Sequence, residues 1–256
     1  MKFCRLQKRF FNRPTLQVAR ELLGNYVVRK YRNAKIAGKI VETEAYIGPY
    51  DKASHAFGGK KTLRNAAEYM TGGHIYIYLV YGMHWQFNIS TRGEGYAECV
   101  LIRALEPIAN GTMNDQKLFI HSRRRLRAQA MGQRPRAQAM GQRPRAQAMG
   151  ESENSRERLR AAIGIANGPG KLCRYLKLDK SFYAEDACRS KRIRLEDRGE
   201  RTSRNNVVAS ARIGIDYAGP IWAKKPWRFY IKGNPFVSGV HKKSKEARNN
   251  EPRSVS

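Results

Sequence analysis

Acidic residues are scarce in this chain of 256 residues, which holds 21 of them against 50 lysines and arginines. The formal net charge is therefore +29, and the isoelectric point is about 10.4. Such a surplus strains a compact fold through self-repulsion unless a polyanion neutralises it, and nucleic acid is the commonest such partner. An anionic membrane surface is the alternative, but no basic amphipathic helix with a wide apolar face supports it.

Long apolar runs are also missing. The longest run covers residues 75–81, far shorter than the roughly 20 residues that a membrane-spanning helix needs. The first five residues lack the apolar stretch of a secretory signal. We therefore expect an intracellular protein, in the nucleus of a eukaryote or in the cytoplasm and nucleoid of a prokaryote, with no membrane partner.

Cysteine is infrequent and shows no pattern. The four cysteines, Cys4, Cys99, Cys173 and Cys188, form no Cys-x-x-Cys pair, and no pair of histidines lies near them at zinc-ligand spacing. The sequence therefore predicts reduced thiols and no structural metal.

A repeat of nine residues interrupts the chain. Residues 127–135 recur as 136–144, and the same pattern begins again at 145–150. Each full copy contains proline and glycine, which cannot sustain a helix, and too few apolar residues for a stacked solenoid. Eight arginines and no acidic residue lie between 123 and 150, which leaves +21 for the remainder. We predict a flexible basic insert over 123–150.

The insert divides what we predict to be one mixed α/β (α+β) domain with a curved, largely antiparallel sheet, surrounding helices and a protruding β-hairpin. Residues 1–122 form its N-terminal part, 151–240 its C-terminal part, and 241–256 a polar tail. The hydrophobic pattern predicts helices near 14–23, 63–70, 157–166 and 171–178. It predicts strands at 26–31, 36–47, 75–81, 85–91, 98–105, 212–217 and 228–232.

Two carboxylates stand out on the predicted strand 36–47. Period-two alternation places Glu42, Glu44 and Tyr46 on one face of it. A half-exposed strand with a solvated acidic face explains this pattern, and a pocket with a positioned glutamate as general base explains it too. The scarcity of acidic residues elsewhere favours the pocket.

The predicted hairpin 75–91 carries Tyr81 and Met83 at its turn, where polar residues are usual. Gly82 at the first central position favours a type II′ turn. The hairpin is either buried, or it is a wedge of the kind that DNA-bending proteins insert between base steps. The segment 167–171 opens a helix whose N-terminus attracts anions, but its spacing is not that of a phosphate-binding Walker loop.

Several sequence blocks together resemble the alkyladenine type of 3-methyladenine DNA glycosylases, over about residues 10–240 except the insert. In chain order they are Val41-Glu-Thr-Glu-Ala-Tyr-Ile-Gly-Pro49, His55, Arg64-Asn65, Tyr76-Ile-Tyr-Leu-Val-Tyr-Gly-Met83, Asn88-Ile-Ser90, Arg103-Ala-Leu-Glu-Pro107, Asn167-Gly-Pro-Gly-Lys-Leu-Cys173, Arg212-Ile-Gly-Ile and Trp227-Arg-Phe-Tyr-Ile-Lys-Gly-Asn-Pro-Phe-Val-Ser238. Their fixed order makes chance similarity improbable.

The resemblance implies a monofunctional enzyme of base-excision repair that acts on double-stranded DNA as a monomer. Such an enzyme flips a damaged purine of the 3-methyladenine, 7-methylguanine, hypoxanthine or ethenoadenine class out of the duplex and hydrolyses its N-glycosidic bond, leaving an abasic site. It implies that Glu44 activates the attacking water, that Arg103 helps hold Glu44 and that water, and that neither a metal nor another cofactor takes part.

The resemblance also implies a base-binding pocket. Tyr46, His55 and Tyr78 would sandwich the flipped base, because a cationic alkylpurine is attracted to electron-rich rings. Asn88 would discriminate against the exocyclic amine of guanine.

Outside the pocket, the resemblance implies that Tyr81 fills the gap in the base stack, with Met83 beside it, and that Arg64 and Lys171 contact phosphates. Leu63 stands where the family commonly has proline.

Two other classes explain parts of the sequence. A non-catalytic nucleic-acid-binding module accounts for the charge and the aromatic residues, but gives Glu44, His55 and Arg103 no purpose. A nuclease would use clustered carboxylates for Mg²⁺, for which Glu42 and Glu44 are the candidates.

Overall fold

The computed structural model describes residues 3–108, 164–200 and 202–239. Within these ranges, residues up to 108 and from 165 onward belong to one compact unit. The predicted insert 123–150 and tail 241–256 lie outside the described residues, as does most of the predicted helix 157–166. The predicted domain boundaries therefore stay predictions.

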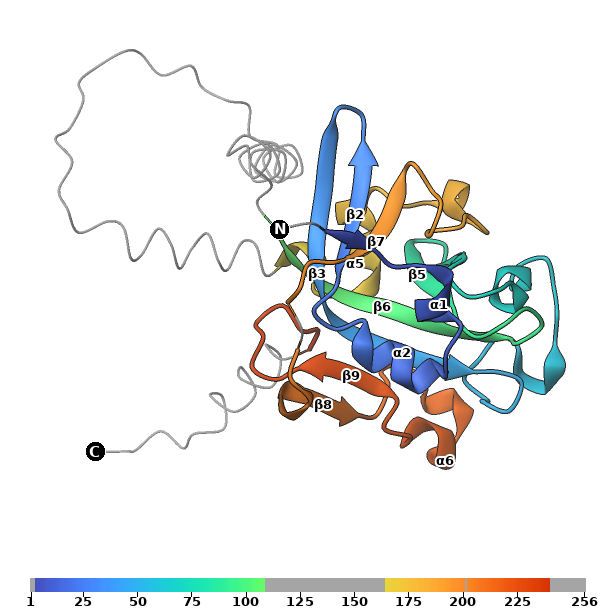
Figure 1. The fold of residues 1–256 in the computed structure, drawn as a ribbon. Coiled ribbons are helices and arrows are strands. Elements are labelled where there is room, and N and C mark those ends of the chain that lie inside the picture. The colour runs from blue at the N-terminus through green and yellow to red at the C-terminus, as the bar shows by residue number, and fades with distance from the viewer. Residues whose placement is uncertain (1–2, 109–163, 201, 240–256) are drawn as a thin grey trace, which may run out of the picture. The chain divides into compact units, whose positions relative to one another are not determined.

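The described residues form a nine-stranded sheet in which every pairing is antiparallel (Figure 1). The spatial order is β1-β7-β2-β3-β6-β5-β4, and β9 pairs with both β3 and β8. The strands are β1 (Cys4–Arg5), β2 (Tyr26–Tyr31), β3 (Ala34–Ile47), β4 (Ile75–Val80), β5 (His84–Ser90), β6 (Glu98–Pro107), β7 (Ile193–Asp197), β8 (Val207–Ser210) and β9 (Arg228–Ile231).

Short helices surround this sheet. The α-helices are α1 (Lys8–Phe11), α2 (Thr15–Glu21), α5 (Pro169–Leu176) and α6 (Pro220–Ala223). The 3₁₀ helices are η1 (Phe57–Gly59), η2 (Ala66–Tyr69), η3 (Lys180–Phe182), η4 (Arg204–Asn206) and η5 (Asp216–Ala218). The predicted mixed α/β class with a largely antiparallel sheet is confirmed. No helix in the described part of the chain is long and apolar enough to cross a membrane.

The two faces of β3 have different roles. Thr43 is buried, and its Oγ1 donates to the carbonyl of Ala19 in α2 at 2.8 Å, so this face of β3 packs on that helix. Because side chains alternate along a strand, Glu44 and Tyr46 lie on the opposite face. The sheet thus separates the apolar layer under α2 from a polar layer that includes Glu42, Glu44 and Arg103.

Two bulges interrupt the pairing of β3 with β6. The register runs from Ile40↔Leu105 to Glu42↔Ala104 and then to Thr43↔Ile102, so Val41 and Arg103 are the extra residues. A bulge re-aims the side chain of its extra residue and strengthens the local twist. Both bulges lie within three residues of Glu44, which places the irregularity at the polar layer.

Two local predictions are wrong. The hairpin turn has positive φ at both Tyr81 (51°) and Gly82 (67°), and Met83 N–H donates to the Val80 carbonyl. This is the pattern of a type I′ turn centred on Tyr81 and Gly82, because a type II′ turn has positive φ only at its first central residue. The predicted strand 212–217 is also absent, because that segment turns and ends in η5.

Candidate functional site

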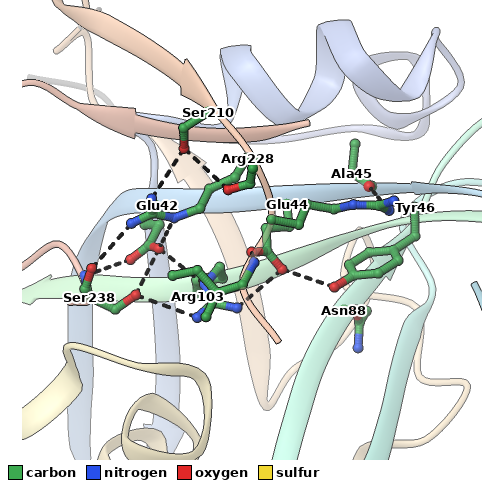
Figure 2. Close-up of polar contacts among 12 residues, drawn as sticks. Glu42, Glu44, Ala45, Tyr46, Asn88, Arg103, Ser210, Arg228 and Ser238 are labelled. Carbon is green, nitrogen blue, oxygen red and sulfur yellow. Dashed lines mark hydrogen bonds and ion pairs between the residues drawn. The ribbon is translucent and has the colours of Figure 1, made fainter. Parts of the chain in front are cut away.

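Glu44 lies on β3 with no exposed surface, and all of its partners are polar (Figure 2). Its Oε2 accepts hydrogen bonds from the Tyr46 hydroxyl at 2.9 Å and from Arg103 Nη1 at 3.1 Å. Its Oε1 accepts from the backbone N–H of Ile213 at 2.8 Å. A carboxylate has about four acceptor positions. These three bonds therefore leave one position for a further donor.

Arg103 connects the two glutamates of β3. Its Nε donates to Glu42 Oε1 at 3.0 Å while its Nη1 reaches Glu44. Burial alone would lower the pKa of Arg103, but the carboxylates of Glu44 and Glu42 raise the pKa above its ordinary value. Arg103 is therefore a fixed positive charge that orients Glu44.

Glu42 has no exposed surface and is bonded on both oxygens. Its Oε1 accepts from Arg103, Arg228 and the Ser238 hydroxyl, and its Oε2 accepts from the Ser238 backbone N–H at 2.7 Å. Figure 2 shows Arg228 and Ser238 closing around this carboxylate. The interpretation of a solvated acidic face is therefore wrong, because arginines cover both carboxylates.

An aromatic cluster lies next to Glu44. The rings of His55 and Tyr78 meet edge to face, with centroids 4.6 Å apart, and Tyr76 lies 5.0 Å from Tyr78. The Tyr76 hydroxyl is 2.6 Å from His55 Nδ1. Burial and the neighbouring Arg64 hold the pKa of His55 below its usual value, so the imidazole is neutral at neutral pH.

Tyr46 joins this cluster to Glu44 through its hydroxyl. Burial, with the nearby Glu44 carboxylate, raises the pKa of Tyr46 well above that of a free phenol, so the group stays a donor. The guanidinium of Arg212 lies 4.7 Å from the centre of the Tyr46 ring and is held by the buried carboxylate of Asp51. Arg212 thus covers one face of the Tyr46 ring.

Tyr46 and Tyr78 pack on the same buried residues, which include Tyr76 and Cys99. Asn88 is 2% exposed, and its Nδ2 donates to the Tyr76 carbonyl at 3.1 Å. Register places Tyr46 opposite Cys99, and Asn88 opposite both Tyr76 and Leu101. Three of the four predicted pocket residues therefore lie on strands of one sheet, and His55 reaches them from the loop after β3.

The hairpin β4–β5 exposes its tip. Tyr81 is 86% exposed and Met83 is 69% exposed, so the interpretation of a buried hairpin is wrong. A tyrosine in the left-handed region costs about 1–2 kcal/mol. An exposed aromatic residue held in such a conformation indicates a functional constraint rather than a stabilising one.

The two predicted phosphate contacts lie near the hairpin. Arg64 is exposed, donates to the Leu79 carbonyl at 3.2 Å and places its guanidinium 5.3 Å from the Tyr78 ring centre. Lys171 lies in the first turn of α5, and its Nζ donates to Asn167 Oδ1 at 2.8 Å. A Cβ on the neighbouring Gly170 would approach within 3.0 Å of His84, so this helix start is packed against the hairpin.

Comparison with known proteins assigns the chain to a family. The family model "Methylpurine-DNA glycosylase (MPG)" matches residues 9–235. The chain belongs to the methylpurine-DNA glycosylase family. It is 40% identical over 235 residues to "Putative 3-methyladenine DNA glycosylase" of Desulfitobacterium hafniense, covering 91% of this chain and 98% of that protein. It is 37% identical over 237 residues to "DNA-3-methyladenine glycosylase" of Homo sapiens, covering 92% of this chain and 68% of that protein.

Membership of the methylpurine-DNA glycosylase family confirms the resemblance seen in the ordered sequence blocks. This chain is therefore a DNA repair glycosylase, an enzyme that hydrolyses N-glycosidic bonds, and its substrate is DNA. The alternatives of a non-catalytic binding module and of a Mg²⁺-dependent nuclease are overturned by this assignment. Among the described residues, no group of three or more histidine, cysteine or acidic side chains is arranged to hold a metal ion.

Sequence reasoning missed part of the polar layer of this glycosylase. The sequence offers Glu42 only as a solvated or metal-binding carboxylate, and it predicts no role for Asp51. The matched blocks contain Arg212, Arg228 and Ser238, but nothing in the sequence assigns them partners. Their contacts with β3 span 167 to 196 residues along the chain, a separation that local patterns do not report.

Proposed function

We propose that this glycosylase flips a damaged or alkylated purine out of duplex DNA and hydrolyses its N-glycosidic bond with a water activated by Glu44. The observation that carries the proposal is the position of Glu44. Its carboxylate is fully buried and is bonded to Arg103 and to the hydroxyl of Tyr46, which belongs to the aromatic cluster. Extrusion is required because the bond is inaccessible inside the base stack.

The flipped base lies, in this proposal, between Tyr46 on one side and the touching rings of His55 and Tyr78 on the other. The shared packing of Tyr46 and Tyr78 on one buried cluster supports this slot. Electron-rich rings on both sides favour a cationic alkylpurine. Asn88 borders the same cluster and would reject the exocyclic amine of guanine.

Three hydrogen-bond donors bind the Glu44 carboxylate, and the attacking water would bind at its remaining acceptor position. Glu44 takes a proton from the water as the water oxygen attacks C1′ of the sugar, and the bond between C1′ and the purine nitrogen breaks. The electron pair of that bond leaves with the base, which a positive charge on an alkylated purine makes easier. Arg103 holds the Glu44 carboxylate in place through their ion pair. The product is an abasic site, and no metal or other cofactor enters.

The hairpin and the helix start would hold the DNA. Tyr81, with Met83 beside it, fills the space of the extruded base, which its exposure at the tip supports. Arg64 and Lys171 bind phosphates on either side of the hairpin. The partner is thus duplex DNA with one damaged purine, bound by a monomer in the nucleus or the bacterial nucleoid.

The test is a duplex that carries a single hypoxanthine or ethenoadenine, incubated with the protein and then treated with hot alkali. We expect strand cleavage at the lesion only after alkali, because an abasic site without a lyase step survives until then. Methylated DNA provides the third substrate, from which free 3-methyladenine is released. If none of the three substrates loses its base, the proposal is wrong.

A further inference from the structure

A buried acid lies beneath the aromatic cluster and takes no part in the proposed reaction. Glu68 belongs to η2 and is 2% exposed. Its Oε1 accepts a hydrogen bond from Cys99 Sγ at 3.4 Å, and the nearby Asn65 side chain favours its charged form, whereas its Oε2 is buried and no hydrogen-bond donor meets it in good geometry. A buried polar atom without a partner requires an explanation, because native structures rarely leave one.

The position of Glu68 relates it to the base slot. Cys99, its hydrogen-bond donor, is one of the residues on which Tyr46 and Tyr78 pack, and lies opposite Tyr46 in the sheet. The Cys99 sulfur is also 3.9 Å from Asn88 Oδ1. The carboxyl group therefore lies one side chain away from the residues that would border the flipped base.

We propose that Glu68 is a specificity-determining residue of this pocket, and that its negative charge favours cationic purines over neutral ones. This inference rests on the proposed function, since it assumes that the base lies between Tyr46 and Tyr78. A negative charge near a cation attracts it strongly in a medium that excludes water.

Glu68 is also poised to change its charge. Burial raises the pKa of the Glu68 carboxyl from its ordinary range to about 8. The acid is therefore mostly neutral at pH 7 and mostly ionised at pH 9, and a cationic base bound above it would lower this pKa in turn.

The other titratable groups near Glu68 do not change charge in this range. Burial is the main cause that raises the pKa of Tyr69, Tyr76, Tyr78 and Cys99. These groups therefore stay neutral, and Asp51 is paired with Arg212. Glu68 is the group on this side of the pocket whose ionisation follows pH between 7 and 9.

The experiment compares a cationic substrate with a neutral one. We would measure kcat/KM for 3-methyladenine in methylated DNA and for ethenoadenine in a duplex, from pH 6.5 to pH 9.5, and take their ratio. Both substrates use the same Glu44, so effects common to both reactions cancel in the ratio. We expect the ratio of the wild-type protein to rise about tenfold between pH 7 and pH 9 as the charge appears.

Two variants separate the charge from the fold. Glu68→Gln keeps the shape without the charge, and Glu68→Met fills the site with an apolar chain, so both should give a ratio that does not change with pH. Glu94→Gln removes an exposed carboxylate and should follow the wild-type curve.

Each outcome either supports or overturns the proposed role of Glu68. A wild-type ratio that stays constant with pH, or a ratio that still rises in both Glu68 variants, overturns the inference while leaving the proposed function intact. If the wild type excises neither lesion, the proposed function is wrong and this inference with it. If neither variant folds, the wild-type curve alone still decides.

Discussion

Arg103 Nη1 donates to Glu44 Oε2 over 3.1 Å, and both side chains are buried. Arg103 can reach Glu44 because it is the extra residue of a bulge in β6, which turns its side chain toward β3. Charges removed from water in this way are stable only when every partner is in place. The contact therefore makes the proposed general base dependent on residues from several distant parts of the chain.

Glu44→Gln tests the proposed base. An amide cannot accept the proton of the attacking water, so excision in single turnover should fall by at least about 100-fold. Binding to a duplex with ethenoadenine should remain, because the aromatic slot is unchanged. Glu94→Gln serves as the control for loss of one carboxylate. If Glu44→Gln excises the base at the wild-type rate, Glu44 is not the base.

Glu42→Gln tests the support beneath Glu44. Glu42 binds both Arg103 and Arg228, so its neutralisation leaves an excess buried positive charge and should lower the free energy of unfolding by about 3–5 kcal/mol. Urea unfolding measures this change. The exposed Glu21, which pairs with Arg13, provides the control, because Glu21→Gln should cost less than about 1 kcal/mol. Equal effects of both variants would contradict the buried network.

Tyr81→Ser tests the wedge. The substitution removes the ring that would fill the gap in the stack, so binding to a lesion duplex should weaken more than binding to undamaged DNA. The control is Phe3→Ser, an exposed aromatic residue next to β1 at the opposite edge of the sheet from the hairpin. Titration of both duplexes by fluorescence anisotropy gives the two affinities. If Tyr81→Ser weakens both equally, the wedge role is wrong.

Glu68 also predicts a dependence of stability on pH. Its pKa is raised to about 8 in the folded protein, above the value of about 4.5 in the unfolded chain. The stabilisation is therefore present below pH 4.5 and is lost as the pH rises to about 8, with a slope of about 1.4 kcal/mol per pH unit.

Glu68→Gln removes this slope, because an amide does not titrate. The stability of the variant relative to the wild type should therefore increase between pH 5 and pH 8, as measured by urea unfolding at several pH values. A constant difference across this range would show that the carboxyl is not protonated in the folded protein.

Metal removal should have no effect. Both Glu42 oxygens and both Glu44 oxygens are bonded to arginine, hydroxyl or backbone donors, so neither carboxylate is arranged as a metal ligand. Excision measured with EDTA and with added Mg²⁺ should therefore agree once ionic strength is matched. Inhibition by EDTA at matched ionic strength would require a different mechanism.

The sequence predicted those parts of the fold that depend on neighbouring residues. The alternation along β3 and the apolar run of β4 follow from side-chain period, so both strands were found near their observed bounds. The segment 212–217 also has the apolar residues of a strand, but Arg212 turns inward to Asp51, and this long-range pairing overrides local propensity.

The charge excess and the ordered blocks were enough, by themselves, to indicate nucleic acid and the glycosylase family, because both can be read along the chain. Three features could not be read from the sequence alone. They are the burial of Glu42 and Glu44, the bulge that turns Arg103, and the unpartnered oxygen of Glu68. A sequence shows which carboxylates a chain contains, but the tertiary structure decides which of them are buried and which arginine pairs with each one. That decision depends on contacts between residues 31 to 196 positions apart along the chain, and it distinguishes the proposed base Glu44 from its support Glu42 and from Glu68, whose pKa is raised.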